Sequence, residues 1–343
     1  MKVCLICNSI ILAKSKQYKN KKYCSKKCKN VAYRKRRSIE ERLDRKRTNL
    51  KQNDETLVMI RQCRRAKTVQ ILSGHTVESL FKTMKLIRDR PNAKINLCHI
   101  APVNGSKIIG KFHHENLFYG GAYQNKKFGN NWTGKGKYIL KSKVDEGWAV
   151  NDSMTNIEVI HLIENFLGEV LVKYIEKHPV RKSRRASLIN AIMKVSNDGF
   201  IEDELFNMSY KDLSILKSQL EENGYCKIWS APPESKYLTY IQELDRFSYM
   251  HKGDKFNRMR KIRNMLVIGY IALEKIPDSK TFNTKFYSSY GEYLERFGYI
   301  ELIDASKWSR FKDFMYDSAF RTLQGEELNT KKLYKRFKKY IDI

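Results

Sequence analysis

Residues 95–130 read INLCHIAPVNGSKIIGKFHHENLFYGGAYQNKKFGN, and their composition differs from that of the rest of the chain. The segment 93–145 around them holds seven of the 17 glycines and three of the seven histidines. It also contains short runs with strand character, at residues 94–97, 107–112 and 137–139. Glycine-rich loops are where binding and catalytic residues concentrate. We therefore predict a compact α+β unit here, with function carried by its loops.

The sequence outside this unit is typical of helices. Residues 38–72 contain no glycine or proline, which predicts one long basic helix or arm. Apolar residues at helical spacing predict further helices over residues 77–88, 156–177 and 210–223. Residues 234–343 are rich in Tyr and Phe, and we expect several more helices there.

The charge of the chain is strongly positive. Its 343 residues carry 67 Lys and Arg against 37 Asp and Glu, a net charge of +30, and residues 1–50 alone contribute +14. Such an excess is typical of proteins that work on a polyanion, which favours nucleic acid as the partner. No run approaches the roughly 18 apolar residues of a membrane span, and the N-terminus lacks a signal-peptide pattern. We therefore expect no membrane partner and a cytoplasmic location, which is the host cytoplasm if a phage encodes the chain.

Four of the seven cysteines form two pairs near the N-terminus, Cys4-x2-Cys7 and Cys24-x3-Cys28. This spacing can bring four sulfurs to one tetrahedral Zn²⁺, the alternative being accidental spacing in a Lys-rich tail. Residues 1–33 have too few apolar side chains to fold without a metal. Because four cysteines leave no open coordination position, we expect a structural Zn²⁺. The segment around Cys24 resembles the second knuckle of treble-clef or ribbon zinc modules.

A second pattern lies in the α+β unit. His99 ends a short apolar run, Asn116-Leu117 follows seventeen residues later, and Asn125 follows nine residues after that. This order resembles the HNH endonuclease superfamily, also called ββα-metal or His-Me finger. Within it, the segment is similar to phage recombination endonucleases of the Rap/NinG kind, which also join a cysteine-knuckle N-terminus and a basic arm to the nuclease unit. The resemblance covers about residues 1–35 and 93–135.

The resemblance implies a metal-dependent DNA endonuclease that acts on branched or recombination-intermediate DNA of a phage. His99 would be the general base, because a neutral imidazole is available near physiological pH. Asn125 would be an oxygen ligand of Mg²⁺ or a similar divalent ion, with His113 and His114 assisting. Asn116 would tie the loop that holds the histidine strand. The residues expected to contact DNA are Arg34, Lys35, Arg36, Arg37, Lys126 and Lys127.

One residue departs from the family pattern. Many HNH enzymes have a His or Asp metal ligand directly before the base, whereas this chain has Cys98, and a thiol is a poor ligand for Mg²⁺. Either the coordination is sparser or the metal is softer. Taken singly, each histidine and asparagine also has an ordinary interpretation as a packed, capping or turn residue. The alternative function is a non-enzymatic, zinc-containing DNA-binding regulator, because positive charge favours phosphate affinity but not cleavage.

These expectations combine into an α+β chain with a small N-terminal zinc module, a ββα-metal nuclease unit and a mostly helical C-terminal region. A homodimer is compatible with this organisation. The expected domains are a Cys4 zinc module over 1–33, a basic helical arm and linker over 34–90, the HNH-like nuclease unit over 91–150, a helical region with a basic cluster over 151–230, and a C-terminal helical domain that binds DNA or a partner over 231–343.

Overall fold

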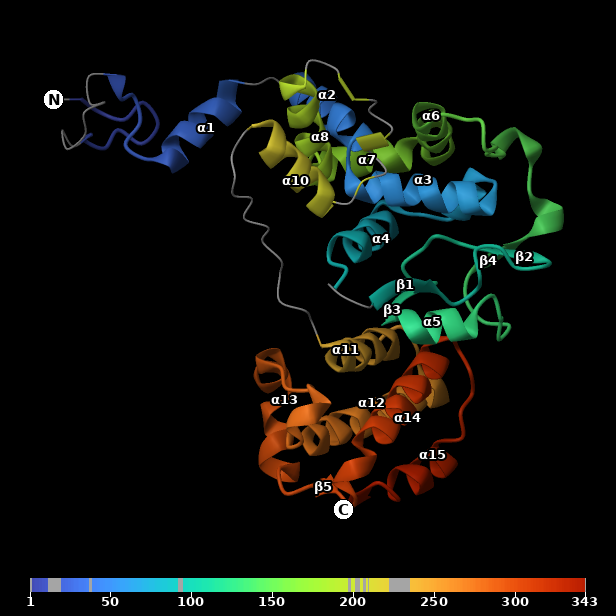
Figure 1. Ribbon diagram of the computed structural model, residues 1–343. Helices are drawn as coiled ribbons and strands as arrows, with labels where there is room; N and C mark the ends of the chain where they lie inside the picture. The colour runs from blue at the N-terminus through green and yellow to red at the C-terminus, as the bar shows by residue number, and fades with distance from the viewer. Residues whose placement is uncertain are drawn as a thin grey trace.

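The structure is a computed structural model that describes residues 2–11, 20–36, 39–91, 95–196, 199–200, 204–205, 208, 210–221 and 235–342. The fold is α+β and mostly helical, as predicted from the sequence. Figure 1 shows the N-terminal module projecting to one side of two groups of helices. The strands β1 and β3 and helix α5 lie between these two groups (Figure 1).

The first group of helices, called the N-terminal lobe, is built around one apolar core. Buried side chains from early and late segments share this core, among them Met59, Leu80, Val159 and Ile163. The segment expected to be a basic arm is therefore part of a packed lobe. The helices of the N-terminal lobe are α2 (Ile39–Lys51), α3 (Asp54–Ala66), α4 (Val77–Arg88), α6 (Asn156–Leu167) and α7 (Glu169–Lys177), with a 3-10 turn η2 (Val69–Leu72).

The helix predicted over residues 77–88 is confirmed as α4, but two longer predictions are wrong. The expected helix over 38–72 is broken between α2 and α3. There the side chain of Asn53 accepts hydrogen bonds from the amides of Glu55 and Thr56, and so starts a new helix. The expected helix over 156–177 is broken at Gly168, whose φ of 46° is incompatible with a continuous helix.

Two further helices flank this lobe. Helix α8 (Arg184–Val195) packs against α10 (Tyr210–Leu220). Helix α10 begins at the first residue of the stretch predicted over 210–223 and ends before the last. Ile189, Ile192 and Leu213 form a small apolar cluster between them. The first helix of the chain, α1 (Lys26–Arg36), belongs to the N-terminal module.

The central hairpin consists of β1 (Ile95–His99) and β3 (Leu117–Gly121), which pair antiparallel with His99 opposite Leu117. Helix α5 (Ala122–Phe128) follows β3 directly. The sequence pattern predicts β1 but not β3. The reason is that all five residues of β3 are buried, so the strand lacks the alternation of apolar and polar residues that marks a half-exposed strand.

A second two-stranded sheet lies at the edge of the α+β unit, formed by strands that are not consecutive in the chain. β2 (Ile108–Gly110) pairs antiparallel with β4 (Tyr138–Leu140), and both coincide with predicted strand-like runs. Two 3-10 turns, η3 (Lys141–Lys143) and η4 (Glu146–Trp148), lead from β4 back to the N-terminal lobe.

The second group of helices, called the C-terminal lobe, covers residues 235–342. Its core is rich in aromatic side chains, including the stacked pair Tyr270 and Phe286. No helix in the described part of the chain is long and apolar enough to cross a membrane. The elements of this lobe are α11 (Lys236–Ser248), α12 (Gly253–Glu274), η5 (Pro277–Ser279), α13 (Thr284–Phe297), β5 (Glu301–Leu302), η6 (Ala305–Lys307), α14 (Trp308–Leu323), α15 (Thr330–Phe337) and β6 (Ile341–Asp342), with β5 and β6 paired antiparallel.

The central hairpin belongs to both lobes. Successive residues of a strand point to opposite faces of a sheet. Cys98 and Phe118 accordingly join the C-terminal core, whereas Leu117 joins the N-terminal core. The site residues on this hairpin are therefore held between two packed bodies.

Candidate functional site

The two cysteine pairs meet at the N-terminal end of the chain. The sulfurs of Cys4, Cys7, Cys24 and Cys28 all lie within 4.8 Å of one another. Cys7 Sγ lies 3.4 Å from Cys24 Sγ and 3.6 Å from Cys28 Sγ. A tetrahedral Zn²⁺ with Zn–S bonds of about 2.3 Å needs sulfurs about 3.8 Å apart. The four cysteines are therefore close enough to hold one metal ion, and their geometry suits Zn²⁺.

Local backbone structure holds these sulfurs in place. The amide of Cys4 donates to the carbonyl of Ser9 at 2.8 Å, and the amide of Asn8 donates back to the carbonyl of Cys4 at 3.0 Å. Asn8 has a φ of 58°, the left-handed conformation that Asn tolerates better than most residues. Cys28 lies in the first turn of α1. The turn that contains Cys4 and Cys7 and the beginning of helix α1 therefore bring the two cysteine pairs together.

A basic groove of about 650 Å³ lies next to this module, between α1, α2 and the start of α8. Its lining residues in the described part of the chain include no carboxylate. Lys46 is fixed there because its ammonium donates to the carbonyls of Ile175 and Glu176, at 2.6 and 3.0 Å, at the C-terminal end of α7. The cations that line the groove are Arg34, Arg42, Arg45, Lys46, Arg181 and Lys182.

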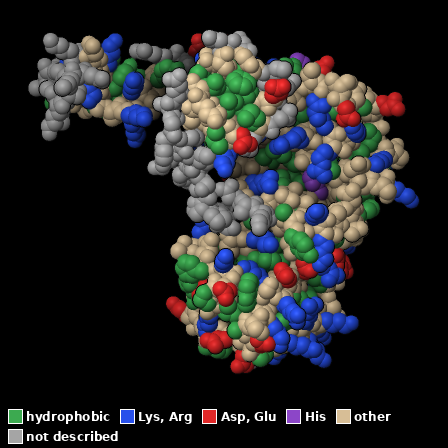
Figure 2. Space-filling model, in the orientation of Figure 1, with side chains coloured by type: hydrophobic (Ala, Val, Ile, Leu, Met, Phe, Trp, Pro, Cys, Tyr) green, Lys and Arg blue, Asp and Glu red, His purple; other side chains and the backbone are tan. Residues whose placement is uncertain are grey.

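Of the residues predicted to contact DNA, Arg34 lines this groove and is exposed. Lys35 and Arg36 continue helix α1, and Arg37 lies outside the described residues. Figure 2 shows that, on the face it draws, Lys and Arg side chains are also spread over both lobes. The groove adds Arg181 and Lys182, which follow α7 and come to the groove only through the tertiary fold.

His99 lies at the end of β1 and points toward the N-terminal lobe. Its ring centroid is 6.2 Å from that of Phe112. Its Nε2 atom is buried and has no hydrogen-bond partner among the described residues. Burial, helped by the nearby positive charge of Arg65, lowers the pKa of His99 to about 3. The imidazole is therefore neutral at physiological pH.

Asn116 is fully buried just before β3, and both the oxygen and the nitrogen of its side-chain amide form hydrogen bonds. Its Oδ1 accepts from the amides of Ala101 and Lys137, at 2.9 and 3.1 Å. Its Nδ2 donates to the carbonyls of Ala101 and Lys111, at 3.2 and 2.9 Å. One side chain thus joins the segment after β1, the segment after β2 and the segment before β4.

Helix α5 carries the other predicted residues of the unit. Its Phe128 packs on Phe320 of α14, so α5 lies against the C-terminal lobe. Lys127 forms an ion pair with Asp317 at 3.0 Å, which raises the pKa of Lys127, while Lys126 is exposed. Asn125 is half-buried, and within the described residues no hydrogen bond joins its side chain to His99.

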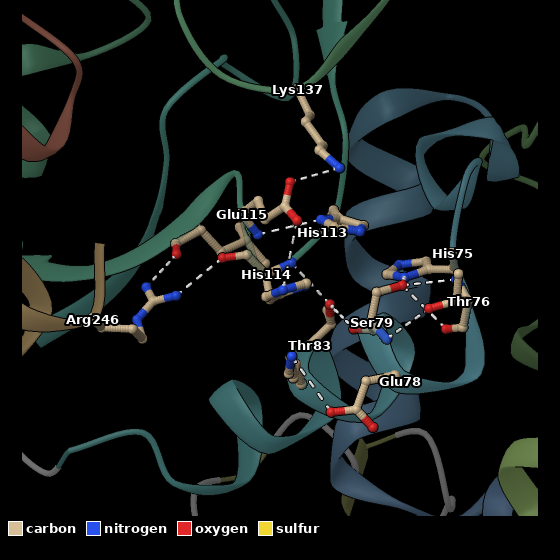
Figure 3. A network of polar contacts seen from close by, with 12 residues as sticks. His75, Thr76, Glu78, Ser79, Thr83, His113, His114, Glu115, Lys137 and Arg246 are labelled. Carbon is tan, nitrogen blue, oxygen red and sulfur yellow. Dashed lines mark hydrogen bonds and ion pairs between the residues drawn. The ribbon is translucent and has the colours of Figure 1, made fainter. Parts of the chain in front are cut away.

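His113 and His114 belong to a polar network that Figure 3 shows from close by. His113 stacks on His75 with ring centroids 4.8 Å apart, and its ring lies 4.5 Å from that of His114. His75 is held at both nitrogens, by the hydroxyl of Ser79 at 3.0 Å and by the carbonyl of Phe112 at 2.9 Å. The three rings form one continuous stack between α4 and the loop before β3.

Charged residues surround this stack. The carboxylate of Glu115 pairs with Lys137 at 2.6 Å, and Arg246 of α11 donates to the carbonyl of His114 at 3.1 Å (Figure 3). Burial lowers the pKa of His75 to about 4. Burial, followed by the effect of neighbouring His75, lowers the pKa of His113 to about 3. Both rings are therefore neutral at physiological pH.

The residues expected to bind Mg²⁺ are Asn125 on α5 and His113 and His114 in the loop before β3. In the described ranges, the four N-terminal cysteines are the one group of three or more His, Cys, Asp or Glu residues close enough to hold an ion. Within the same ranges, no hydrogen bond or ring contact joins Asn125 to either histidine. The thiol of Cys98 is buried in the C-terminal core, where burial raises its pKa to about 12, so it offers no ligand either. We assign no ligand set for a catalytic metal.

Glu115 was expected from the sequence to assist the metal through water, whereas His75 and Arg246 were not predicted to be parts of this network. The Thr76-x-x-Ser79 capping box gave a signal for the start of α4, but nothing in it showed that His75 stacks on His113. No protein-family model matches the chain, and no curated protein or solved structure is significantly similar to it.

Proposed function

We propose that the protein is a DNA endonuclease of the HNH kind that hydrolyses phosphodiester bonds, on branched or recombination-intermediate DNA of a phage. The observation that carries the proposal is the order of β1, β3 and α5, with His99 at the end of the first strand and buried Asn116 tying the loops around it. A hairpin followed by a helix, with these residue types at these places, is the arrangement that the resemblance implies.

The chemistry proposed for His99 is that of a general base. Hydrolysis needs a group that takes a proton from the attacking water, and the Nε2 atom of His99 has no protein partner among the described residues. The burial that lowers the pKa of His99 also makes this nitrogen a weak proton acceptor while it stays away from water. His99 as a whole is only partly buried, and the proposal requires its Nε2 atom to meet water when DNA is bound.

DNA binding is assigned to the six cations of the basic groove and to the zinc module beside it. Lys and Arg side chains neutralise backbone phosphates and release condensed counterions, a contribution that does not depend on sequence. Among the residues that the structure describes, no acidic side chain lines the groove to oppose a phosphate. Dependence of cleavage on Mg²⁺ remains part of the proposal, with no ligands assigned.

A second candidate function is supported by a specific observation. Within the described residues, no hydrogen bond or ring contact joins Asn125 to His99, and helix α5, which packs on β1, is also held against the C-terminal lobe through Phe128. A DNA-binding regulator would use the zinc module and the groove, with the hairpin as scaffold. It would not need Asn125 and His99 to lie close together.

One experiment separates the two functions. Purified protein is incubated with supercoiled plasmid, a Holliday junction and a flap substrate, with Mg²⁺ or with EDTA, and binding is measured on the same substrates. Nicking that requires the divalent ion supports the endonuclease. Tight, salt-sensitive binding without nicking on any substrate supports the regulator and rejects the endonuclease.

A further inference from the structure

A pocket of about 430 Å³ is lined by residues of both lobes and by Ile100, which follows β1. Its basic lining residues come from α4, the 135–137 loop and α12, and they are Lys82, Lys135, Lys137 and Lys255. Its apolar side is formed by residues that belong to the C-terminal core, Ile100, Phe247, Met259 and Leu323. His114 and Glu115 also line it.

We propose that this pocket binds one nucleotide unit, with the phosphate held by Lys135 and Lys255 and the base against the apolar side. The volume lies within the range of about 300–1,000 Å³ that is usual for small-ligand sites. An apolar wall beside a few convergent charged groups is the composition expected of such a site. The proposal does not rest on cleavage by the protein.

Four lysines line the pocket, and three of them already pair with a carboxylate, so the excess positive charge that favours an anionic ligand comes from Lys255. Lys82 pairs with Glu78 at 3.5 Å, Lys137 with Glu115 at 2.6 Å and Lys135 with Glu327 at 3.4 Å. Lys255 is half-buried and forms no ion pair within 4 Å in the part of the chain that the structure describes.

The pKa of Lys255 is lowered by burial first and then by the charge of Lys135. Two ammonium groups that repel each other in a partly buried place are stabilised when a phosphate lies between them.

His114 adds a polar group to the lining of the pocket. The residue is 7% exposed, and its Nδ1 atom has no hydrogen-bond partner among the described residues. Its Nε2 atom lies 3.9 Å from Glu115 Oε1, which is beyond hydrogen-bond distance. A buried imidazole nitrogen without a partner is costly unless a ligand supplies one.

The wall that carries Lys135 is held rigidly. Gly136 has a φ of 94°, and a Cβ there would lie 2.4 Å from Asn116 Oδ1, so the loop lies directly on the buried asparagine. Trp132 Nε1 donates to the carbonyl of Lys135 at 2.7 Å, and Thr133 donates to the carbonyl of Gln324 at 2.7 Å. A preformed wall lowers the ordering cost of binding.

The test is calorimetric titration of the full chain with thymidine monophosphate and, separately, with inorganic phosphate. We expect binding of the nucleotide, and Lys255→Gln and Lys135→Gln should each weaken it at least tenfold. Lys331→Gln, an exposed lysine on α15, is the matched control and should leave the affinity unchanged. Equal affinity for inorganic phosphate would show that the phosphate group alone is recognised, and it would overturn the assignment of a nucleotide site.

A second measurement checks that the variants are folded. Because Lys255→Gln removes charge repulsion, its melting temperature without ligand should equal or exceed that of the wild type, while the increase caused by nucleotide should disappear. Absence of binding by the wild type, or unchanged affinity in both pocket variants, would overturn the proposal. Since no DNA is cut in this assay, its outcome is independent of the endonuclease test.

Discussion

The N-terminal module and the central hairpin are held in place in opposite ways. In the module, four sulfurs converge over a short stretch, and Cys4, Ile11 and Ala32 are its buried apolar residues in the described part. In the hairpin, strands β1 and β3 are covered on both faces by the cores of two lobes. We therefore expect the module to depend on a bound metal ion, whereas the hairpin depends on packing against distant parts of the chain. Removing a single ligand or a single packing contact should accordingly have different consequences in the two places.

The largest effect should come from removing the metal. Chelation, or Cys24→Ser, should unfold the N-terminal module, because zinc binding by such modules supplies about 10–16 kcal/mol that is also folding energy. Elemental analysis should find one Zn²⁺ per chain in the wild type and a large loss in the variant. Limited proteolysis should remove the module and spare residues 39–342.

A cysteine elsewhere provides the control for this comparison. Cys63→Ala changes a thiol that is buried in the N-terminal core, and it should keep the full zinc content while lowering the stability of that lobe. A wild-type protein prepared without chelators that holds no zinc would contradict the metal-dependent half of the comparison.

The next largest effect concerns His99. If it is the general base, His99→Ala should reduce cleavage by about 10²–10⁴-fold, as is typical for a positioned acid or base. DNA binding should persist, since the basic groove lies elsewhere. His161→Ala, at an exposed histidine on α6, should cut at the wild-type rate. Full cleavage by folded His99→Ala protein would reject the assignment.

A smaller effect is expected at Asn116. Replacing it with Ala removes four hydrogen bonds and leaves buried backbone groups of Ala101, Lys111 and Lys137 without partners, at a cost of about 2–4 kcal/mol. Chemical denaturation measures the loss. Asn125→Ala is the matched control and should change the free energy of unfolding by less than about 0.5 kcal/mol. Equal costs at the two sites would show that Asn116 is not the residue that ties the loops.

The smallest effects per residue should be found in the basic groove. Arg45→Gln and Arg181→Gln should each weaken DNA binding on every sequence tested and reduce the slope of log K against log salt by about 0.9. Fluorescence anisotropy over a salt series gives both quantities. Lys331→Gln serves again as a surface control. A slope that stays constant in both groove variants would place the DNA elsewhere.

The two regions also differ in how well the sequence predicted them. Cysteine spacing alone located the metal site, because its ligands lie on short local segments. The same is true of helix α4, whose apolar stripe and capping box mark its length. Such features depend on neighbours in the chain, so their pattern survives in the sequence.

Features set by distant packing were not predicted. Strand β3 contains Gly120 and Gly121, which weaken any strand signal but allow Phe320 and Tyr240 to approach the backbone. The pKa of His99 depends on burial beneath another lobe. The pocket between the lobes is built from residues that the sequence separates widely, such as Lys82 and Lys255, and no spacing rule connects them.

The sharing of β1 and β3 between two cores has a consequence for how the molecule melts. Loss of the C-terminal lobe would expose Cys98, Ile100 and Phe118, and loss of the N-terminal lobe would expose Leu117 on the same pair of strands. Unfolding of either lobe would therefore expose one face of the hairpin to solvent. The two lobes should unfold together and give a single peak in calorimetry. A fragment that ends before residue 235 should expose the apolar face of the hairpin and aggregate.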